Sequence, residues 1–148
     1  MSHSIKQDPF VFPSIEQSFL IVIMLAVKAD KIFSQSEKEV IKQSLLPMKL
    51  FENYSEEQLS SAIKKALLRI EIEGEDIALR EAAKNLPSEL HKFTFSLAVD
   101  LIVSDSKITQ AEQVVLDKIQ HTLSISINLA QRIISEKSLR INLLKFNF

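Results

Sequence analysis

The stretch from Phe19 to Val27 reads FLIVIMLAV, nine apolar residues in a row. A helix needs about 20 apolar residues to cross a bilayer, so this run is too short to span a membrane. It also has no polar face, which is typical of a helix that protein surrounds on every side. We therefore predict a helix over 14–29, capped at its start by Ser14, at the centre of the molecule.

Composition favours an all-α fold. The 148 residues include one Gly, four Pro and no Trp, and 46% of them are hydrophobic. Because β-hairpins need Gly and Asn at their turns, this poor supply of turn residues favours helices joined by short loops. A chain of this length and apolar content can bury one core, so we expect a single domain over 1–148.

Composition also excludes several classes of function. The sequence has no cysteine, which rules out disulfides, thiolate metal sites and a thiol nucleophile. A formal net charge of −1 offers no overall positive field for nucleic acid. The first ten residues lack the basic start and apolar segment of a secretory signal, so we expect a cytoplasmic protein that does not insert into a membrane.

Periodicity and capping signals predict about seven helices. Ser55 and Gln58 form a capping box ahead of apolar residues spaced by three and four, and Gly74 ends that helix. The run FTFSLAVDLIV predicts a second helix enclosed on all sides and packed directly on the first. The closing stretch LRINLLKFNF has no clear helical period, so we expect the last helix to end early. The predicted helices cover 14–29, 35–46, 55–73, 75–86, 88–104, 110–122 and a final segment that starts at an Asn128 cap.

Two octets in the chain are nearly the same. DKIFSQSE spans 30–37 and DSKITQAE spans 105–112, and they share the first Asp, the Gln at the sixth place and the final Glu at an offset of 75 residues. Agreement at one fixed offset indicates an internal repeat. The predicted repeat halves are 14–73 and 88–148, with the helix over 75–86 as connector. The two apolar helices would then form a pseudo-two-fold centre.

Helix capping explains the second half of each octet. Ser34 with Glu37, and Thr109 with Glu112, have the capping-box pattern in which the hydroxyl accepts from the third amide of the helix and the Glu reaches back to the cap amide. Both Glu residues are therefore expected to have structural roles at the start of a helix.

Capping does not explain Asp30 and Asp105. Each follows an apolar helix, where the negative pole of the helix dipole disfavours a carboxylate by about 0.3 to 1 kcal/mol. Two explanations stay open: each Asp accepts hydrogen bonds from amides at the start of the next helix, or the carboxylates hold a hard divalent cation such as Ca²⁺ or Mg²⁺. The candidate metal ligands are Asp30, Glu37, Asp105 and Glu112.

The pattern in MLAVKADKIFSQSE, and more loosely in SLAVDLIVSDSKITQAE, resembles the tellurite-resistance TerB and TerB-like family. The shared features are an apolar helix, an Asp, a short turn with an apolar residue, a Ser or Thr cap and a Glu three residues later. The resemblance implies a cytosolic all-helical stress-resistance module without enzymatic activity. It also implies divalent-cation binding through clustered acidic residues, here Asp30, Glu37, Asp105 and Glu112, and a protein partner in a membrane-linked complex. The alternative hypothesis is a metal-free helical domain for protein–protein interaction.

The remaining polar residues give no catalytic pattern. His3, His91 and His121 are scattered without metal-ligand spacing and are expected at the surface or at helix interfaces. No arrangement of nucleophile and base is readable, so we expect no enzymatic activity. Asp100 lies within an apolar helix, and we expect it either to pair with a Lys or Arg or to lie near the acidic site.

Overall fold

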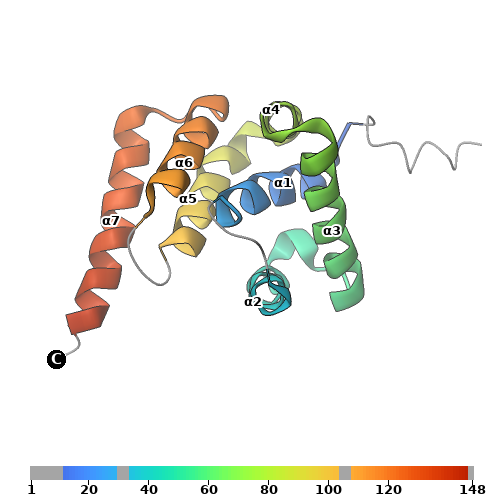
Figure 1. Cartoon of the computed structure of the whole chain (residues 1–148), viewed down its shortest axis with the longest axis horizontal. Helices are drawn as coiled ribbons and strands as arrows, with labels where there is room; N and C mark the ends of the chain where they lie inside the picture. Colours follow the sequence, from blue (N-terminus) through green and yellow to red (C-terminus); the bar gives the residue numbers. More distant parts are fainter. Residues whose placement is uncertain (1–11, 30–33, 104–107, 147–148) are drawn as a thin grey trace, which may run out of the picture.

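The computed structural model describes residues 12–29, 34–103 and 108–146. These residues form seven α-helices and two short 3₁₀ segments, with no strand among them, which confirms the all-α class (Figure 1). The elements are α1 (Ile15–Val27), α2 (Gln35–Leu45), η2 (Lys49–Phe51), α3 (Glu56–Glu73), α4 (Glu75–Asn85), η3 (Ser88–Leu90), α5 (His91–Ile102), α6 (Gln110–Thr122) and α7 (Ile127–Phe146).

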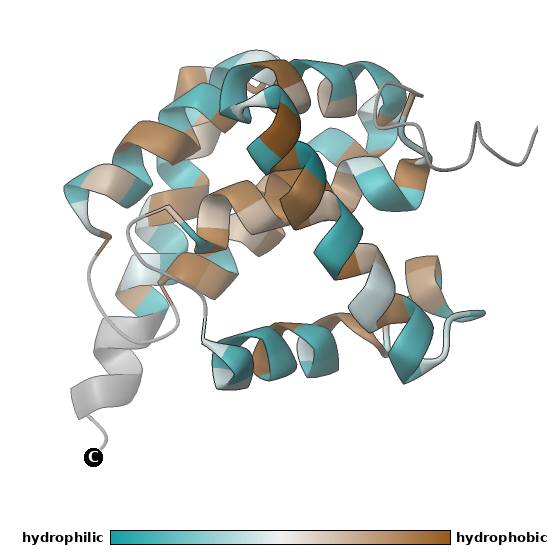
Figure 2. Cartoon of the chain, turned by 45° about the vertical axis from the view of Figure 1, so that its right-hand side comes forward, coloured by the Kyte–Doolittle hydropathy of each residue, from teal (hydrophilic) through white to brown (hydrophobic). Residues whose placement is uncertain are grey.

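The helix α1 is the centre of the molecule. The Ser14 hydroxyl caps it by accepting from the Gln17 amide at 3.1 Å, and every residue from 18 to 27 is buried. Helices α3, α4, α5 and α6 all pack against it. Figure 2 shows its hydrophobic residues in the middle of the molecule, while the outer helices alternate between hydrophobic and hydrophilic residues. The predicted central helix is confirmed.

The helix α5 packs directly on α1, as the sequence predicts, but protein does not enclose it. Leu97 and Leu101 are only half-buried, and Phe93 is exposed. The prediction of a second helix buried on all sides was therefore wrong. The physical reason is its position: α5 packs against α1, α6 and α7, and the side with Phe93 faces solvent. The buried residues of α5 are Thr94, Phe95, Ala98, Val99 and Ile102.

The two halves of the proposed repeat pack differently. Helix α6 lies against α1, α4 and α5, whereas α2, at the same place in the first half, packs mainly against α3 (Figure 1). An ion pair links α2 to α3, because the Lys42 ammonium lies 3.0 Å from Glu39 of the same helix and 3.6 Å from Glu56 of α3. The internal repeat therefore stays a prediction from the sequence.

An ion-pair cluster joins α5 to α7. Asp100 Oδ1 lies 2.8 Å from Lys137 Nζ and 3.2 Å from an Arg140 guanidinium nitrogen. The prediction that Asp100 pairs with a basic residue is confirmed. Two cations on one carboxylate hold the middle of α7 against α5, which the apolar pattern of the tail alone did not indicate.

The helix α7 starts and ends at different residues from those predicted. The Ser126 hydroxyl accepts from the Leu129 amide at 3.1 Å and so caps the helix, in place of the predicted Asn128. The helix continues to Phe146, so the expected early end was also wrong. Packing against α5 supports a helix whose own sequence period is weak. Within the described ranges, no helix combines the length and the apolar character that a membrane crossing requires.

His91 has a structural position at the start of α5. Its Nδ1 lies 3.0 Å from the Leu123 carbonyl oxygen, and its Nε2 lies 2.8 Å from the Leu86 carbonyl oxygen. Leu86 ends α4 and Leu123 ends α6. One imidazole therefore joins the start of α5 to the ends of two other helices, in agreement with the expected interface histidine.

Candidate functional site

The two capping boxes of the acidic octets are present. In α2, Glu37 Oε1 accepts from the Ser34 amide at 2.9 Å, while the Ser34 hydroxyl accepts from the Glu37 amide at 3.1 Å. In α6, Glu112 Oε1 accepts from the Thr109 amide at 2.9 Å, and the Thr109 hydroxyl accepts from the Glu112 amide at 3.1 Å. The structural half of the octet prediction is confirmed in both copies.

The environments of these two carboxylates differ. Glu112 is 7% exposed and counts among the buried residues, whereas Glu37 is only half-buried. A buried carboxylate is costly unless it is hydrogen-bonded, and the Thr109 amide supplies such a bond. The difference follows from the fold, because α6 packs on the central helix and α2 lies at the edge of the molecule.

The other two predicted ligands, Asp30 and Asp105, lie outside the described residues. Among the residues that the structure describes, no group of three or more His, Cys, Asp or Glu side chains is arranged to hold a metal ion. The helices that carry Glu37 and Glu112 are not among those that pack closely together. The cation site of four carboxylates therefore stays a prediction.

We predict that the two caps contribute separately to stability. Ser34→Ala and Thr109→Ala each remove the hydroxyl that satisfies an amide in the first helical turn, so each lowers the free energy of unfolding by about 0.5 to 2 kcal/mol. Chemical denaturation measures this change. Ser61→Ala, at an exposed place within α3, is the matched control and changes it by less than about 0.5 kcal/mol. Unchanged denaturation midpoints in both cap variants would contradict the capping account.

A second candidate site is a groove at the start of α1, with a volume of about 750 Å³. Three segments form its walls: the first turns of α1, the stretch 48–53 that contains η2, and the junction of η3 with α5. We call this feature the α1–α5 groove. Its lining residues are Glu16, Phe19, Met48, Lys49, Leu50, Glu52, Asn53, Leu90 and Phe93.

Stacked aromatic rings support the wall of the α1–α5 groove. The Phe93 ring stacks on Phe19 with centroids 6.3 Å apart and planes 17° apart, and Phe19 contacts Phe51 at 5.9 Å. Tyr54 meets the Phe51 ring edge-on at 5.2 Å. Phe19 and Phe51 are fully buried, but Phe93 is 47% exposed. Such pairs contribute about 0.5 to 1.5 kcal/mol each beyond their burial, so the stacked Phe19 ring helps to hold the Phe93 ring at the wall of the groove.

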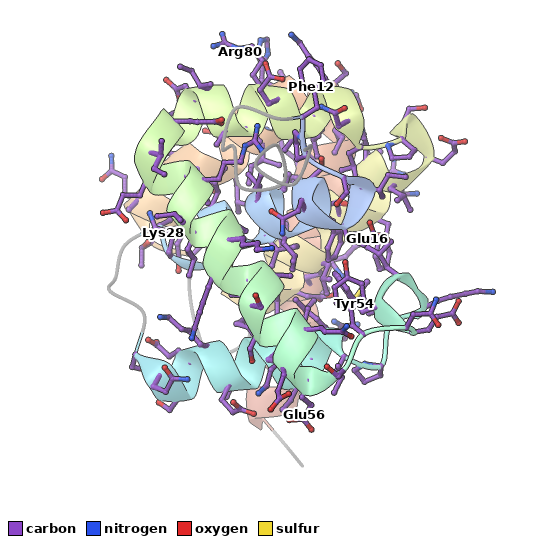
Figure 3. All side chains as sticks on the ribbon, turned by 90° about the vertical axis from the view of Figure 1, so that its right-hand side faces the viewer. Phe12, Glu16, Lys28, Tyr54, Glu56 and Arg80 are labelled. Carbon is purple, nitrogen blue, oxygen red and sulfur yellow. The ribbon has the colours of Figure 1, made fainter. Side chains whose placement is uncertain are left out.

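Acidic side chains outnumber basic ones in the lining of the groove. Glu16 and Glu52 line it together with one cation, Lys49. Burial raises the pKa of the Tyr54 phenol, and the negative charge of Glu16 raises it further. Glu16 therefore lies close enough to act on Tyr54, and Figure 3 shows both on one face of the molecule.

The lining of the groove combines apolar and polar residues. Five of the described lining residues are apolar, and the other four are Glu16, Lys49, Glu52 and Asn53. An apolar wall with a few polar groups is typical of binding sites.

Sequence reasoning missed this groove. The stretch PMKLFENY, residues 47–54, joins the predicted helices over 35–46 and 55–73 and is expected to be a loop. Its apolar residues Met48, Leu50, Phe51 and Tyr54 were the available signal, because loops are usually polar. Phe51 is fully buried and anchors the stretch against Phe19. Its neighbours Met48 and Leu50 can therefore form a wall.

Comparisons of the chain with models of protein families, with curated proteins and with solved structures find no match. The resemblance to the TerB-like family thus depends on the octet motif and the order of helices, and it stays a prediction.

We predict that Tyr54 titrates above the ordinary tyrosine value of about 10. Glu16→Gln lowers this pKa only part of the way, because burial is the larger cause and remains. Tyr54 is the only Tyr and the chain has no Trp, so the ultraviolet absorbance of the phenolate measures it directly. The control is Glu71→Gln, at the far end of α3, which leaves the midpoint unchanged.

The same shift has a consequence for stability in alkali. Above a pH of about 10 the unfolded chain releases the phenolic proton while the folded chain keeps it. The free energy of unfolding therefore falls as pH rises from there through the folded pKa of Tyr54. A Tyr54 midpoint at or below the ordinary value would contradict the proximity of Glu16 and the burial of the ring.

Proposed function

We propose that this protein is a binding module without catalytic activity, and that the α1–α5 groove holds an apolar segment of a protein partner. The observation that carries the proposal is Phe93. Its ring is stacked on the buried Phe19 yet remains 47% exposed beside an open groove of about 750 Å³. Covering an exposed aromatic ring gains roughly 25 cal/mol per Å² of apolar surface, so this ring is a natural binding anchor.

The groove favours a particular partner chemistry. The exposed Phe93 and the half-buried Leu90 form an apolar wall that fits one large aliphatic or aromatic side chain. The volume of the groove is in the range of about 300 to 1,000 Å³ found for ligand sites. Glu16 and Glu52 favour a Lys or Arg close to that side chain. We therefore expect a helix or loop that presents a large apolar residue beside a basic one.

Phe93→Ala should weaken partner binding by about 2 kcal/mol, roughly thirtyfold in dissociation constant, because it removes the exposed anchor. The probes are peptides selected from a random library on the unsubstituted protein, and their affinities are measured by titration calorimetry. Val114→Ala on α6 is the matched control, since Val114 is 49% exposed and lies outside the groove. The control variant binds the same peptides without change.

Circular dichroism and melting temperature show whether each variant keeps its fold. Two results would contradict the proposal: selected peptides that bind the folded Phe93→Ala variant as tightly as the unsubstituted protein, or peptides that bind with no preference for an apolar residue beside a basic one.

A second proposal follows from the resemblance to the TerB-like family. In it the protein is a cytoplasmic module of tellurite or stress resistance that binds a protein in a membrane-linked complex. A Ca²⁺ or Mg²⁺ ion bound by Asp30, Glu37, Asp105 and Glu112 would stabilise it. The supporting observation is that Glu37 and Glu112 occupy equivalent places in the first turns of α2 and α6, as the proposed repeat requires.

The cation proposal makes a separate prediction. An ion that binds only the folded chain raises the free energy of unfolding by about 2.7 kcal/mol at 100 times its dissociation constant. We expect Ca²⁺ or Mg²⁺ to raise the melting temperature, and Asp30→Asn combined with Asp105→Asn to abolish that rise. The double variant Asp76→Asn with Asp117→Asn removes the same charge from exposed places and is the control. If millimolar Ca²⁺ and Mg²⁺ do not change the melting temperature, the cation proposal is wrong and the octets act only as helix caps.

A further inference from the structure

The outer face of α3 carries a second exposed apolar feature. Leu68 is 54% exposed and Ile72 is 50% exposed, and the two lie one turn apart on the same side of the helix. Among the described residues, no other helix has two exposed large hydrophobic side chains one turn apart. Figure 3 shows α3 at the front of the molecule, with no other helix in front of it.

Two cations lie next to this apolar pair. Lys64 and Lys65 are exposed and come one turn before Leu68 on the same face of α3. Within the described part of the chain, neither ammonium forms an ion pair. Glu71 is also exposed, so the exposed residues between positions 64 and 72 have a net charge of +1. We call Lys64, Lys65, Leu68 and Ile72 the α3 ridge.

The α3 ridge has the chemistry that the α1–α5 groove favours. The groove presents the exposed Phe93 and has a net charge of −1, since Glu16 and Glu52 outnumber Lys49 in its lining. The ridge presents two apolar side chains beside a net positive charge. Opposite charges around an apolar contact speed the encounter and fix its register. The two surfaces are therefore complementary.

The ridge cannot fill the groove of its own chain. The groove wall at 48–53 comes just before α3, and Leu68 lies twelve residues beyond Glu56, about 18 Å along the axis of that helix. Helix α3 also packs on α1, whose first turns line the groove. Because this packing fixes the distance between ridge and groove, only another molecule can bring a ridge to the groove.

We propose that the occupant of the α1–α5 groove is the α3 ridge of a second copy of this chain. Leu68 and Ile72 then cover Phe93, and the two lysines of the ridge lie toward Glu16 and Glu52. This inference rests on the proposed function of the groove and names its partner. Ridge and groove are different surfaces, so the contact is heterologous, and each copy offers one of each.

Sedimentation equilibrium of the full chain, at concentrations up to about 1 mM, should show association that grows with concentration. Phe93→Ala, or Leu68→Ala combined with Ile72→Ala, removes one side of the contact and should raise the dissociation constant about thirtyfold. Val40→Ala combined with Val114→Ala is the matched control, because it truncates two exposed valines on α2 and α6, outside both surfaces. Circular dichroism shows that each variant keeps its fold.

A mixture of the two variants identifies which surfaces meet. The Phe93→Ala copy keeps its ridge, and the copy with Leu68→Ala and Ile72→Ala keeps its groove. The two should therefore associate with each other more tightly than either does with itself. If either variant alone associates as tightly as the unsubstituted protein, or if the mixture gains nothing, the proposal is overturned.

Removal of charge tests the register of the contact. Lys64→Gln combined with Lys65→Gln should weaken self-association several-fold at low salt and make it less dependent on ionic strength. Arg80→Gln combined with Arg132→Gln removes the same charge from exposed places on α4 and α7 and is the control. Equal weakening by the two pairs would overturn the placement of the lysines beside Glu16.

Failure of this inference is distinguishable from failure of the groove function. A chain that stays monomeric at about 1 mM, while the selected peptides still depend on Phe93, would overturn the second copy as occupant and leave the groove function standing. If neither the peptides nor self-association depends on Phe93, the proposed function of the groove fails as well.

Discussion

Burial of α1 is the constraint on which the rest of the structure depends. Full burial of a large apolar side chain contributes roughly 1.5 to 3 kcal/mol, and the run from Phe19 to Val27 can gain this only if protein covers every side of the helix. Four helices supply that cover. The enclosure also has a cost, because the Ser18 hydroxyl oxygen is buried within the structure without a hydrogen-bond partner, which opposes folding by about 1 to 3 kcal/mol.

The groove is a consequence of how this cover is divided. Helices α3, α4, α5 and α6 pack along α1, but α2 packs mainly on α3 and contributes little to the enclosure. Near the start of α1, the short stretch that contains η2 takes the place of α2 in covering the central helix. The fully buried Phe51 anchors this stretch. A 3₁₀ segment covers less surface than a full helix. An open apolar groove therefore remains between η2 and the start of α5, with Phe93 at its wall.

The two candidate sites differ in how far the sequence could predict them. The caps of the octets are local: Ser34 and Glu37 are three residues apart, so the hydrogen bonds between them follow from the geometry of one helical turn. The groove is not local, since residues near positions 16, 50 and 93 meet only after the chain has packed. Periodicity within single helices carries no information about such a meeting. The apolar stretch from Met48 to Tyr54 was its one trace in the sequence.

The sequence by itself determined the all-α class, the central place of α1 and the three capping boxes, because apolar periodicity and short-range hydrogen bonds depend only on neighbouring residues. It also indicated that Asp100 pairs with a basic residue, since a charge in an apolar helix needs a partner. Only the tertiary structure decided how much of α5 is covered. Both helices are rich in apolar residues, but α5 also contains Lys92 and Asp100, and its cover depends on the number of neighbouring helices that the topology brings to it. That number is set by the path of the whole chain, which also leaves Phe93 exposed and the groove open.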